Sequence, residues 1–444
     1  MASITQYPLV FNSAYVPNVF VVDGIGAADR YVLQVRTEGN TVLSTFKQPA
    51  NASGVGIFDV QRVLQSYLNS ETFVEETPKV TSTPGALFRY RVFYGTETGT
   101  VQTLNNQGIV YNVINAYDNW RVINSDLSGF IPSPFATDCE LNPNITATYP
   151  ETYDFLTNYP GTIPMASTDW RTLSFFNMID APANNWQWNE APFWVRITTT
   201  LNGANRNDVV YAISDANGLD VRTDCTDNTV TYPSSAERIG TVGVGPMNIE
   251  PLLNLTYDEY QVRIYGYDAC NPDAILDCGD YADIIDNYLG DLIYQRSFIL
   301  TDDICQRFEP IQLSFVNQYG IKDYFTFDKR NTRQTVTERN TFTETLGSWN
   351  EPTFEINPNG RGIRTFSSNA KTSMTLSSDW MSDSVSQWLQ ELYQSPSVNI
   401  YVDGQWEPCN LISNTYLQKT YARNFLFQHE VQVEFANNQK IQRG

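Results

Sequence analysis

Apolar and polar residues alternate along the first hundred positions in the manner of β-strands. Two alternating runs, 31–36 and 41–46, lie on either side of the turn 38–40, and together they predict a β-hairpin. An earlier apolar run, Tyr15 to Val22, predicts a further strand in front of the hairpin. The chain therefore opens with a β-rich segment.

A short helix is expected after this hairpin. Apolar side chains recur at helical spacing from Val60 to Tyr67, and Asp59 in front of them is a favourable N-cap. The run 88–94 then alternates again, which predicts the next strand with one face on a core and one face in solvent.

The same pattern returns 189 positions later. Residues 54–65 align without a gap with residues 243–254, where four of the twelve positions are identical and six more keep their chemical type. A predicted hairpin, 193–198 with 209–213, comes before this second copy, and an alternating run, 260–266, follows it. The duplication predicts tandem β-sandwiches of immunoglobulin type, each with one short helix.

The second copy also predicts where its helix begins. Asn248 aligns with Asp59 and is a good N-cap, and Pro251 then falls in the first turn, where its missing N–H costs little. Because glycines lead into the helix, phosphate binding at its N-terminus is a conceivable function. Phosphate-binding loops need a third glycine and a Lys or Ser/Thr at the helix start, and neither recurs in the two copies. We therefore interpret the stretch as a structural turn from a strand into a helix.

Between the two copies, from 116 to 190, the periodic pattern gives way to Pro, Asn, Thr and aromatic residues. The tryptophans Trp120, Trp170, Trp186 and Trp188 argue against a solvated linker, because a linker offers no interior in which to bury them. An extended arm on neighbouring domains or subunits and a long loop over its own domain remain equally open.

A third β-rich region begins near residue 306. It has strand candidates at 311–315, 324–327, 398–402 and 425–435, with a polar tract from Lys329 to Thr345 between them. Asp383 is expected to cap a helix that ends before Pro396. The predicted mainly β chain thus divides into module 1 (1–115), the arm or insertion (116–190), module 2 (191–305) and a C-terminal β-rich domain with one helix (306–444).

Composition restricts the partners. The 444 residues include 28 Lys and Arg against 49 Asp and Glu, a formal charge of −21, which repels phosphate backbones and argues against nucleic acid. No apolar run reaches the roughly 18 residues of a membrane span. The N-terminus shows neither the basic region nor the apolar stretch of an export signal, so we expect neither export nor membrane insertion.

Metal and disulfide chemistry have weak support. The six cysteines form no CxxC pair. Cys270 and Cys278 could form a disulfide in an oxidising medium, although free buried thiols are the preferred interpretation. The acidic segment 268–291 suggests calcium but does not match the EF-hand spacing, and a hairpin insertion followed by a helix with solvent-facing aspartates is the simpler alternative.

The sequence designates no catalytic, cofactor-binding or metal-ligating residue. The single histidine, His429, lies in an alternating apolar run and is expected to be a half-buried strand residue. Every histidine-dependent triad would have to use it. No GxSxG, P-loop or HExxH motif occurs, and Gly24-Ile25-Gly26 lacks the third glycine of a dinucleotide fingerprint. Glycoside hydrolysis needs only two carboxylates, so the missing motifs do not exclude it. A chain with 49 acidic residues always contains some such pair, however, so the composition is no evidence for this activity. We expect no enzyme and no cofactor.

Part of the chain resembles virion proteins of tailed bacteriophages, especially those infecting Bacteroidota. The resemblance rests on pattern, in residues 54–60 with Leu64 and 67–68, and in 315–320, 324–327, 388–392 and 395–396. It covers about half of the chain and transfers no functional residue. It implies a structural role in the tail, baseplate, neck or fibre, with assembly in the host cytoplasm.

Three functions follow as hypotheses. The preferred one is a virion structural protein that forms homo-oligomers and binds other virion proteins. The second is a receptor- or carbohydrate-binding fibre protein, because tryptophans stack on sugar rings as well as fill cores. The third, and the least favoured, is a polysaccharide depolymerase.

Overall fold

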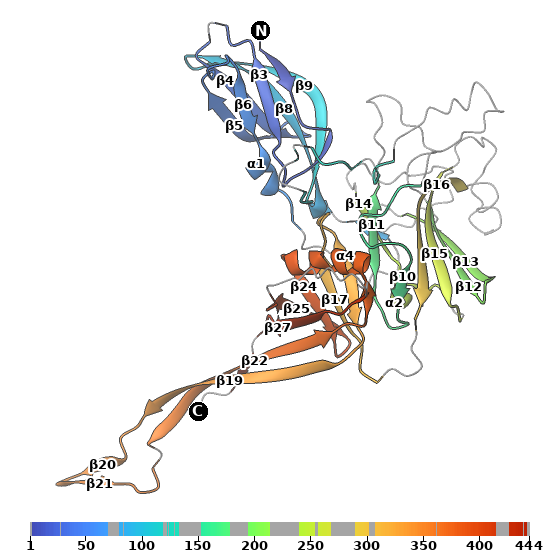
Figure 1. The fold of residues 1–444 in the computed structure, drawn as a ribbon. Helices are drawn as coiled ribbons and strands as arrows, with labels where there is room; N and C mark the ends of the chain where they lie inside the picture. The colour runs from blue at the N-terminus through green and yellow to red at the C-terminus, as the bar shows by residue number, and fades with distance from the viewer. Residues whose placement is uncertain are drawn as a thin grey trace, which may run out of the picture. The chain divides into compact units, whose positions relative to one another are not determined.

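The computed structural model shows a chain made mainly of β-strands (Figure 1). It forms two compact units: the first comprises Met1–Asp302 with Val316–Asp323, and the second comprises Asp303–Phe315 with Tyr324–Gly444. The residues that the structure describes are 2–26, 28–69, 80–82, 84–118, 122, 124–127, 129–132, 152–177, 194–213, 239–253, 256–267, 289–301, 307–360, 362–413, 426–437 and 439–441.

The N-terminal part of the first unit is a sandwich of two sheets, with strand orders β2-β9-β8-β4-β5 and β1-β3-β6. Its strands are β1 (Ser3–Gln6), β2 (Phe11–Ser13), β3 (Val19–Asp23), β4 (Arg30–Thr37), β5 (Val42–Gln48), β6 (Gly56–Asp59), β8 (Leu87–Thr98) and β9 (Val101–Ile114). The hairpin of β4 and β5 and the strand β8 confirm the sequence prediction. The expected strand from Tyr15 to Val22 is wrong in its bounds: Pro17, which has no N–H to donate, lies in the gap between β2 and β3.

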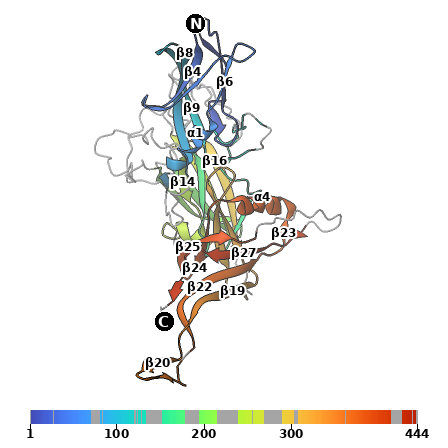
Figure 2. The same cartoon turned by 90° about the vertical axis from the view of Figure 1, so that its left-hand side faces the viewer.

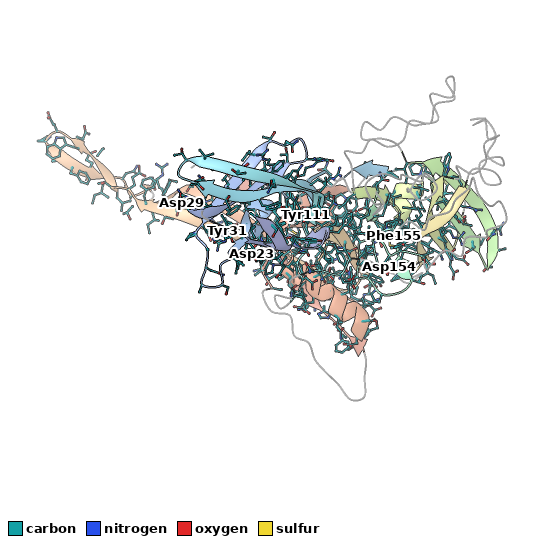
Figure 3. All side chains as sticks on the ribbon, turned by 90° about the horizontal axis from the view of Figure 1, so that it is seen from above. Asp23, Asp29, Tyr31, Tyr111, Asp154 and Phe155 are labelled. Carbon is teal, nitrogen blue, oxygen red and sulfur yellow. The ribbon has the colours of Figure 1, made fainter. Side chains whose placement is uncertain are left out.

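The core of this sandwich lies between its sheets. Alternate residues of β4 and β8, such as Val35 and Val92, pack there with the buried tyrosines Tyr31 and Tyr111 (Figure 3). The Tyr31 hydroxyl donates to Gly54 O at 2.7 Å and accepts from Ile25 N at 2.8 Å. This tyrosine therefore fixes the glycine-containing loop from inside the core, which satisfies its polar group where water cannot reach.

A second sandwich repeats this topology. Its five-stranded sheet has the order β10-β16-β15-β12-β13, in which β10 runs parallel to β16 as β2 does to β9, and every other neighbouring pair is antiparallel. The strands are β10 (Ile163–Met165), β12 (Trp194–Leu201), β13 (Ala204–Ala212), β15 (Glu259–Tyr267) and β16 (Leu289–Leu300). The prediction of tandem β-sandwich modules, each with one short helix, is confirmed.

The other sheet of the second sandwich combines distant parts of the chain. Its order is β11-β14-β7, with β11 (Thr172–Phe176), β14 (Ile239–Gly243) and β7 (Val80–Ser82). The strand β7 comes from the connection between α1 (Gln61–Gln65) and β8 of the first sandwich. The strands β10 and β11 come from the interval 116–190, so part of that interval contributes strands to both sheets of the second sandwich.

The second half of the duplicated stretch has the same contacts in both copies, whereas the first half differs in structure. From position 59 on, the copies agree: Asp59 Oδ1 accepts from Asn18 N at 3.2 Å, and Asn248 Oδ1 accepts from Arg171 N at 2.8 Å. In the first copy the donated N–H belongs to the residue just before β3, and in the second copy it belongs to the residue just before β11, so each contact reaches a strand of the three-stranded sheet. Leu64 and Leu253, five residues farther on in their respective copies, are both buried.

The glycine half of the stretch differs between the copies, and the predicted helix starts are corrected. In the first copy residues 56–59 form β6 and the N-cap of α1 is Val60, although Asp59 Oδ1 still accepts from Gln61 N at 3.0 Å. In the second copy residues 246–249, which align with 57–60, form α2 (Pro246–Ile249), whose N-cap is Gly245 and not Asn248. Pro246 occupies the first helical position, where its fixed φ favours a helical turn.

The second unit is built on one eight-stranded sheet with the order β18-β17-β24-β25-β27-β22-β19, where β28 also pairs with β22. Its strands are β17 (Ile311–Val316), β18 (Lys322–Phe327), β19 (Asn331–Thr343), β22 (Ile363–Ser377), β24 (Val398–Val402), β25 (Gln405–Leu411), β27 (Glu430–Phe435) and β28 (Gln439–Ile441). Two small sheets pair β20 (Gly347–Asn350) with β21 (Thr353–Ile356) and β23 (Met381–Ser382) with β26 (Leu426–Phe427).

The helix α4 (Asp383–Gln394) of the second unit ends before Pro396, as predicted, but its cap is one residue earlier than expected. The Ser382 hydroxyl accepts from Val385 N at 3.4 Å, while Asp383 occupies the first turn, where its charge suits the helix dipole. Trp388 and Leu392 bury the inner face of α4.

Residues 316–323, which include the turn between β17 and β18, belong to the first unit. Asn317 Nδ2 donates to Leu156 O at 2.8 Å, and the buried Asp323 accepts from the Thr157 hydroxyl at 2.8 Å. Tyr319 and Ile321 pack into an apolar cluster of the same unit. Among the described residues, no helix is long and apolar enough to cross a membrane.

Candidate docking surface on the hairpin of the second unit

The single histidine forms the one serine–histidine contact of interest for catalysis. His429 lies between β26 and β27 rather than inside a strand, and it is half-buried as expected. Its Nε2 lies 2.8 Å from Oγ of Ser386 on α4. Ser386 is only 3% exposed, so a substrate carbonyl cannot approach its hydroxyl in this conformation. The contact therefore joins α4 to the chain before β27 and does not form a nucleophilic site.

The candidate metal and disulfide residues fall mostly outside the described part of the chain. Residues 268–288 of the acidic segment, which contain Cys270 and Cys278, are among the residues not described. Within the described ranges, no group of three or more His, Cys, Asp or Glu side chains could hold a metal ion. Cys409 is a free, buried thiol, and burial raises its pKa to about 12. It is therefore an inert core residue.

The hairpin of β19 and β22 extends past the other strands of its sheet (Figure 1). Residues 373–377 of β22 also pair with β27, and residues 368–370 pair with β28. From residue 367 toward the tip, the described strands β19 and β22 pair only with one another. The distal part of this hairpin is thus a two-stranded ribbon, which by itself is at best marginally stable in water.

Polar side chains cover the stem of the hairpin, which comprises residues 331–341 and 367–377. The hydroxyls of Thr335 and Thr372 lie 3.3 Å apart across the strands, and Asn340 Nδ2 donates to Ser367 Oγ at 3.1 Å. Such cross-strand pairs stabilise a ribbon that has no core of its own. Residues 331–341 of this stem lie within the predicted polar tract, Lys329 to Thr345.

The tip of the hairpin, residues 342–366, has the opposite character. Its exposed large apolar side chains are Phe342, Leu346, Trp349, Phe354, Ile356, Ile363 and Phe366. Two backbone hydrogen bonds of 2.8 Å, Glu344 N to Gly362 O and Asn357 N to Leu346 O, continue the ribbon to its end. Figure 2 shows the same hairpin from the side, with β20 at its far end.

One face of the β20–β21 ribbon is entirely apolar. Trp349 pairs directly with Phe354, and Gly347 pairs with Ile356, so these four residues share a face. Ser348, Asn350, Thr353 and Glu355 share the other face. Trp349 is 64% exposed, Phe354 49% and Ile356 69%. We call this face, formed by Gly347, Trp349, Phe354 and Ile356, the tip face.

The charge of the hairpin differs from that of the rest of the chain. Residues 331–377 contain five basic and four acidic side chains, a net charge of +1, while the whole chain carries −21, so the remaining residues carry −22. An almost neutral, apolar tip can approach an acidic surface without the repulsion that the rest of the chain would meet.

Each large side chain of the tip face represents a substantial driving force for association. Complete burial of a Trp, Phe or Ile side chain is favourable by roughly 1.5–3 kcal/mol. Aromatic residues surrounded by small and polar neighbours are the usual centres of protein interfaces. The arrangement is therefore suited to binding another protein.

Sequence reasoning missed the tip face, although a signal for it exists. Apolar residues occupy every second position of 347–350 and 353–356, on either side of Glu351-Pro352. That is the alternation of a hairpin with one apolar face. The predicted polar tract ended at Thr345, and these two four-residue strands beyond it carried no prediction.

Comparisons with known proteins leave the family open. No protein-family model matches the chain, and no curated protein matches it. Among solved structures, the chain is similar to a biofilm-associated protein BSP domain, at 10% identity over 68% of this chain and 30% of that chain, with a TM-score of 0.15. It is similar to a tetra-tandem repeat from the extending region of a large adhesion protein, at 7% identity over 84% of this chain and 69% of that one, with a TM-score of 0.22. It is also similar to native E. coli α2-macroglobulin, at 9% identity over 99% of this chain and 20% of that one, with a TM-score of 0.17. Scores this low carry no argument about function.

Proposed function

We propose that this chain is a structural, non-enzymatic protein of a tailed-phage virion, placed in the tail, baseplate or neck, that assembles with neighbouring subunits through the tip face. The observation that supports assembly is the wholly apolar face of the β20–β21 ribbon at the end of a polar stem. The virion setting rests on the resemblance of the sequence to phage structural proteins.

The physical case for assembly is that the tip face has nothing to bury it within its own ribbon. Trp349 and Phe354 lie side by side on one face, and the strands that carry them pair only with one another. Burying both aromatic side chains against a partner removes apolar surface from water and completes a ribbon that is marginal alone. The protruding stem lets the tip reach a partner that cannot approach the main sheet.

A substitution at the tip tests the assembly role. Trp349→Ala with Phe354→Ala in the full chain should weaken association with other subunits of the particle about thirtyfold or more, because loss of an interface hot spot costs at least about 2 kcal/mol. Trp380→Ala is the matched control, since Trp380 is a tryptophan of the same unit with 62% exposure. Analytical ultracentrifugation and co-purification measure the effect. Equal association of the tip variant and the control would refute the role of the tip.

The virion setting has its own test. Peptides of this chain should be found by mass spectrometry in density-purified phage particles at a copy number consistent with a symmetric assembly. Absence of the chain from purified particles would remove the virion assignment, whatever the result at the tip.

A second function is compatible with the same geometry. An exposed tryptophan such as Trp349 also stacks on sugar rings, so the tip face would serve a receptor- or carbohydrate-binding fibre protein. Glycan-array binding that disappears in Trp349→Ala and persists in Trp380→Ala would favour this function. Binding to no glycan would remove it.

A further inference from the structure

The two sandwiches differ at the edge of the three-stranded sheet beside the short helix. In each sandwich the strand that leads into this helix, β6 or β14, pairs antiparallel with β3 or β11. On its other side β14 pairs with β7, so that Thr241 lies opposite Thr81. The strand β6 has no such neighbour among the described strands and is the edge of its sheet. The first sandwich therefore has an open edge where the second sandwich has a filled one.

Ile57 and Asp59 direct their backbone groups to the open side of β6. Val60 N donates to Asn18 O at 3.1 Å, in register with the ladder of β3 and β6. Hydrogen bonds to one antiparallel neighbour use every second residue, so the even-numbered residues of β6 bond to β3 and the odd-numbered ones face away from it. The Ile57 carbonyl agrees with this direction, because it accepts from Gln48 Nε2, on the other sheet, at 2.6 Å.

The core of the sandwich holds this edge in place. Phe58 is only 3% exposed, and a Cβ added to Gly56 would lie 2.8 Å from Cδ2 of Tyr31, so the strand packs directly on that buried ring. Ile57, between these two residues, projects to the outer face of the sheet and is 51% exposed. Val21 of β3 lies opposite it on the same face. The edge is therefore fixed from the inside and apolar on the outside.

The strand β6 has few of the features that keep other strands away from an edge. Such features are a proline, a lysine, a bulge or an inward-pointing charge. The charged residue of β6 is Asp59, and its Oδ1 accepts from the backbone N–H groups of Asn18 and Gln61 at 3.2 and 3.0 Å. The one protective feature is the length of the strand, four residues. A short strand limits the number of hydrogen bonds to a partner but does not prevent them.

We propose that the open edge of β6 binds the β6 edge of a second copy of this chain, so that the two three-stranded sheets join across a two-fold axis. Because Ile57 and Asp59 are two residues apart, an antiparallel second β6 places each Ile57 opposite the Asp59 of the other copy. The outward N–H and C=O groups of both residues are then paired in both copies. The Ile57 oxygen has two lone pairs, so it can accept this bond beside the one from Gln48.

This register favours a second copy as the occupant. It places no like charges opposite one another, because each Asp59 meets an isoleucine. It also reproduces a contact that the second sandwich already makes, where β7 joins β14 from outside that sandwich. The register forms two hydrogen bonds in each of its two Ile57–Asp59 pairs, fewer than the roughly ten of a typical interface. We therefore expect a weak dimer, which multivalency would strengthen in a larger assembly.

A proline at position 57 tests the edge. Ile57→Pro removes the outward N–H of β6 and no hydrogen bond to β3, as prolines on edge strands do. In the full chain it should weaken self-association about tenfold or more, because both Ile57–Asp59 pairs lose a hydrogen bond. Ile57→Thr is the control, since threonine keeps the N–H and suits a strand. Sedimentation velocity measures self-association, and hydrogen exchange in residues 19–22 reports whether the ladder of β3 and β6 is intact.

Two charge variants keep the test decisive if proline disturbs the sheet. Ile57→Asp places a carboxylate opposite the Asp59 of the other copy and should weaken self-association. Ile57→Lys places an ammonium group there and should retain or strengthen it. The same two changes at Val101, which is 69% exposed on β9, measure the effect of net charge alone.

Weaker self-association of Ile57→Pro than of Ile57→Thr, with an intact ladder, supports the proposal. Equal self-association of these two variants, equal charge effects at positions 57 and 101, or a monomeric unchanged chain up to its solubility limit overturns it. If a monomeric chain lost its place in assembled particles through Ile57→Pro, the edge would belong to a strand of another protein, and the second-copy assignment would be overturned. Failure at β6 leaves the tip test unaffected, since that test uses residues of the second unit.

Discussion

Gly320, in the connection between β17 and β18, is expected to be among the least replaceable positions of the first unit. Its φ is +74°, a left-handed conformation. A Cβ added there would lie 2.6 Å from Asn115 Cβ and 2.8 Å from its carbonyl carbon, and closer still to its carbonyl oxygen. Two independent penalties therefore act on Gly320→Ala: backbone strain and a collision with main-chain atoms that cannot rotate away.

A matched glycine separates the two penalties. Gly404 has a φ of +79°, but a Cβ added there meets nothing within 4 Å, so Gly404→Ala incurs the backbone penalty alone. That penalty is a loss of roughly 1–2 kcal/mol in the free energy of unfolding. Alanine offsets roughly 0.4–1 kcal/mol of it, because it lowers the conformational entropy of the unfolded chain. Overpacking adds about 1–3 kcal/mol. We therefore expect a loss of about 1 kcal/mol for Gly404→Ala and about 2–4 kcal/mol for Gly320→Ala.

Local hydrogen exchange followed by mass spectrometry is the appropriate assay, because a chain of two units does not unfold in one step. Gly320→Ala should speed exchange at Tyr117 N, which donates to Gln318 O at 2.9 Å, and in peptides around 156–159. Asparagine tolerates the left-handed conformation, so Gly404→Asn should recover stability while Gly320→Asn should not. A cost at Gly320 no larger than that at Gly404 would show that the connection does not pack against Asn115, and the reasoning would be refuted.

Three further changes have expected outcomes. Leu64→Ala and Leu253→Ala should each lower the stability of their own sandwich by about 2–5 kcal/mol in local exchange, as truncations of buried leucines do. The Glu97 carboxyl accepts hydrogen bonds from Lys47 and Gln102, and these lower its pKa. The ionised carboxylate therefore stabilises the fold above its ordinary pKa, and this stabilisation should be lost as the pH falls through the lowered pKa. Hydrogen exchange in β8 and β9 should become faster over that pH range in the unchanged chain but not in Glu97→Gln. Cys409, whose pKa burial raises to about 12, should resist alkylation at pH 8 until denaturant is added, as peptide mapping would show.

The sequence predicted strands best where apolar residues alternate and a turn residue is present. The hairpins β4–β5 and β12–β13 have Asn40 and Asn202 at positive φ in their turns, and both were expected from residue order alone. The strand β24 matches its predicted bounds, Val398 to Val402. Local signals were sufficient in these places because the partner strand is near in sequence.

Long-range pairing could not be predicted in this way. The strand β7 is three residues long and pairs with β14, more than 150 residues later, and no local pattern indicates that partner. The predicted helix N-caps were wrong for a different reason. Asp59 and Asn248 are good caps by residue type, but each uses its Oδ1 to accept from the residue before a neighbouring strand, and tertiary structure placed the caps at Val60 and Gly245.

The duplicated stretch indicates how the two sandwiches diverged. Its helical half is conserved in contacts as well as in residue type, because Leu64 and Leu253 fill cores and Asp59 and Asn248 bind the same kind of backbone N–H. Its glycine half forms the strand β6 in the first copy and leads into the helix α2 in the second copy, where Pro246 stands at the position of Ile57. In the second sandwich the strand before this turn, β14, pairs on both sides and receives β7, whereas β6 lies at the edge of its sheet. The two copies therefore share the strand-to-helix turn that closes each core and differ in the sheet edge beside it.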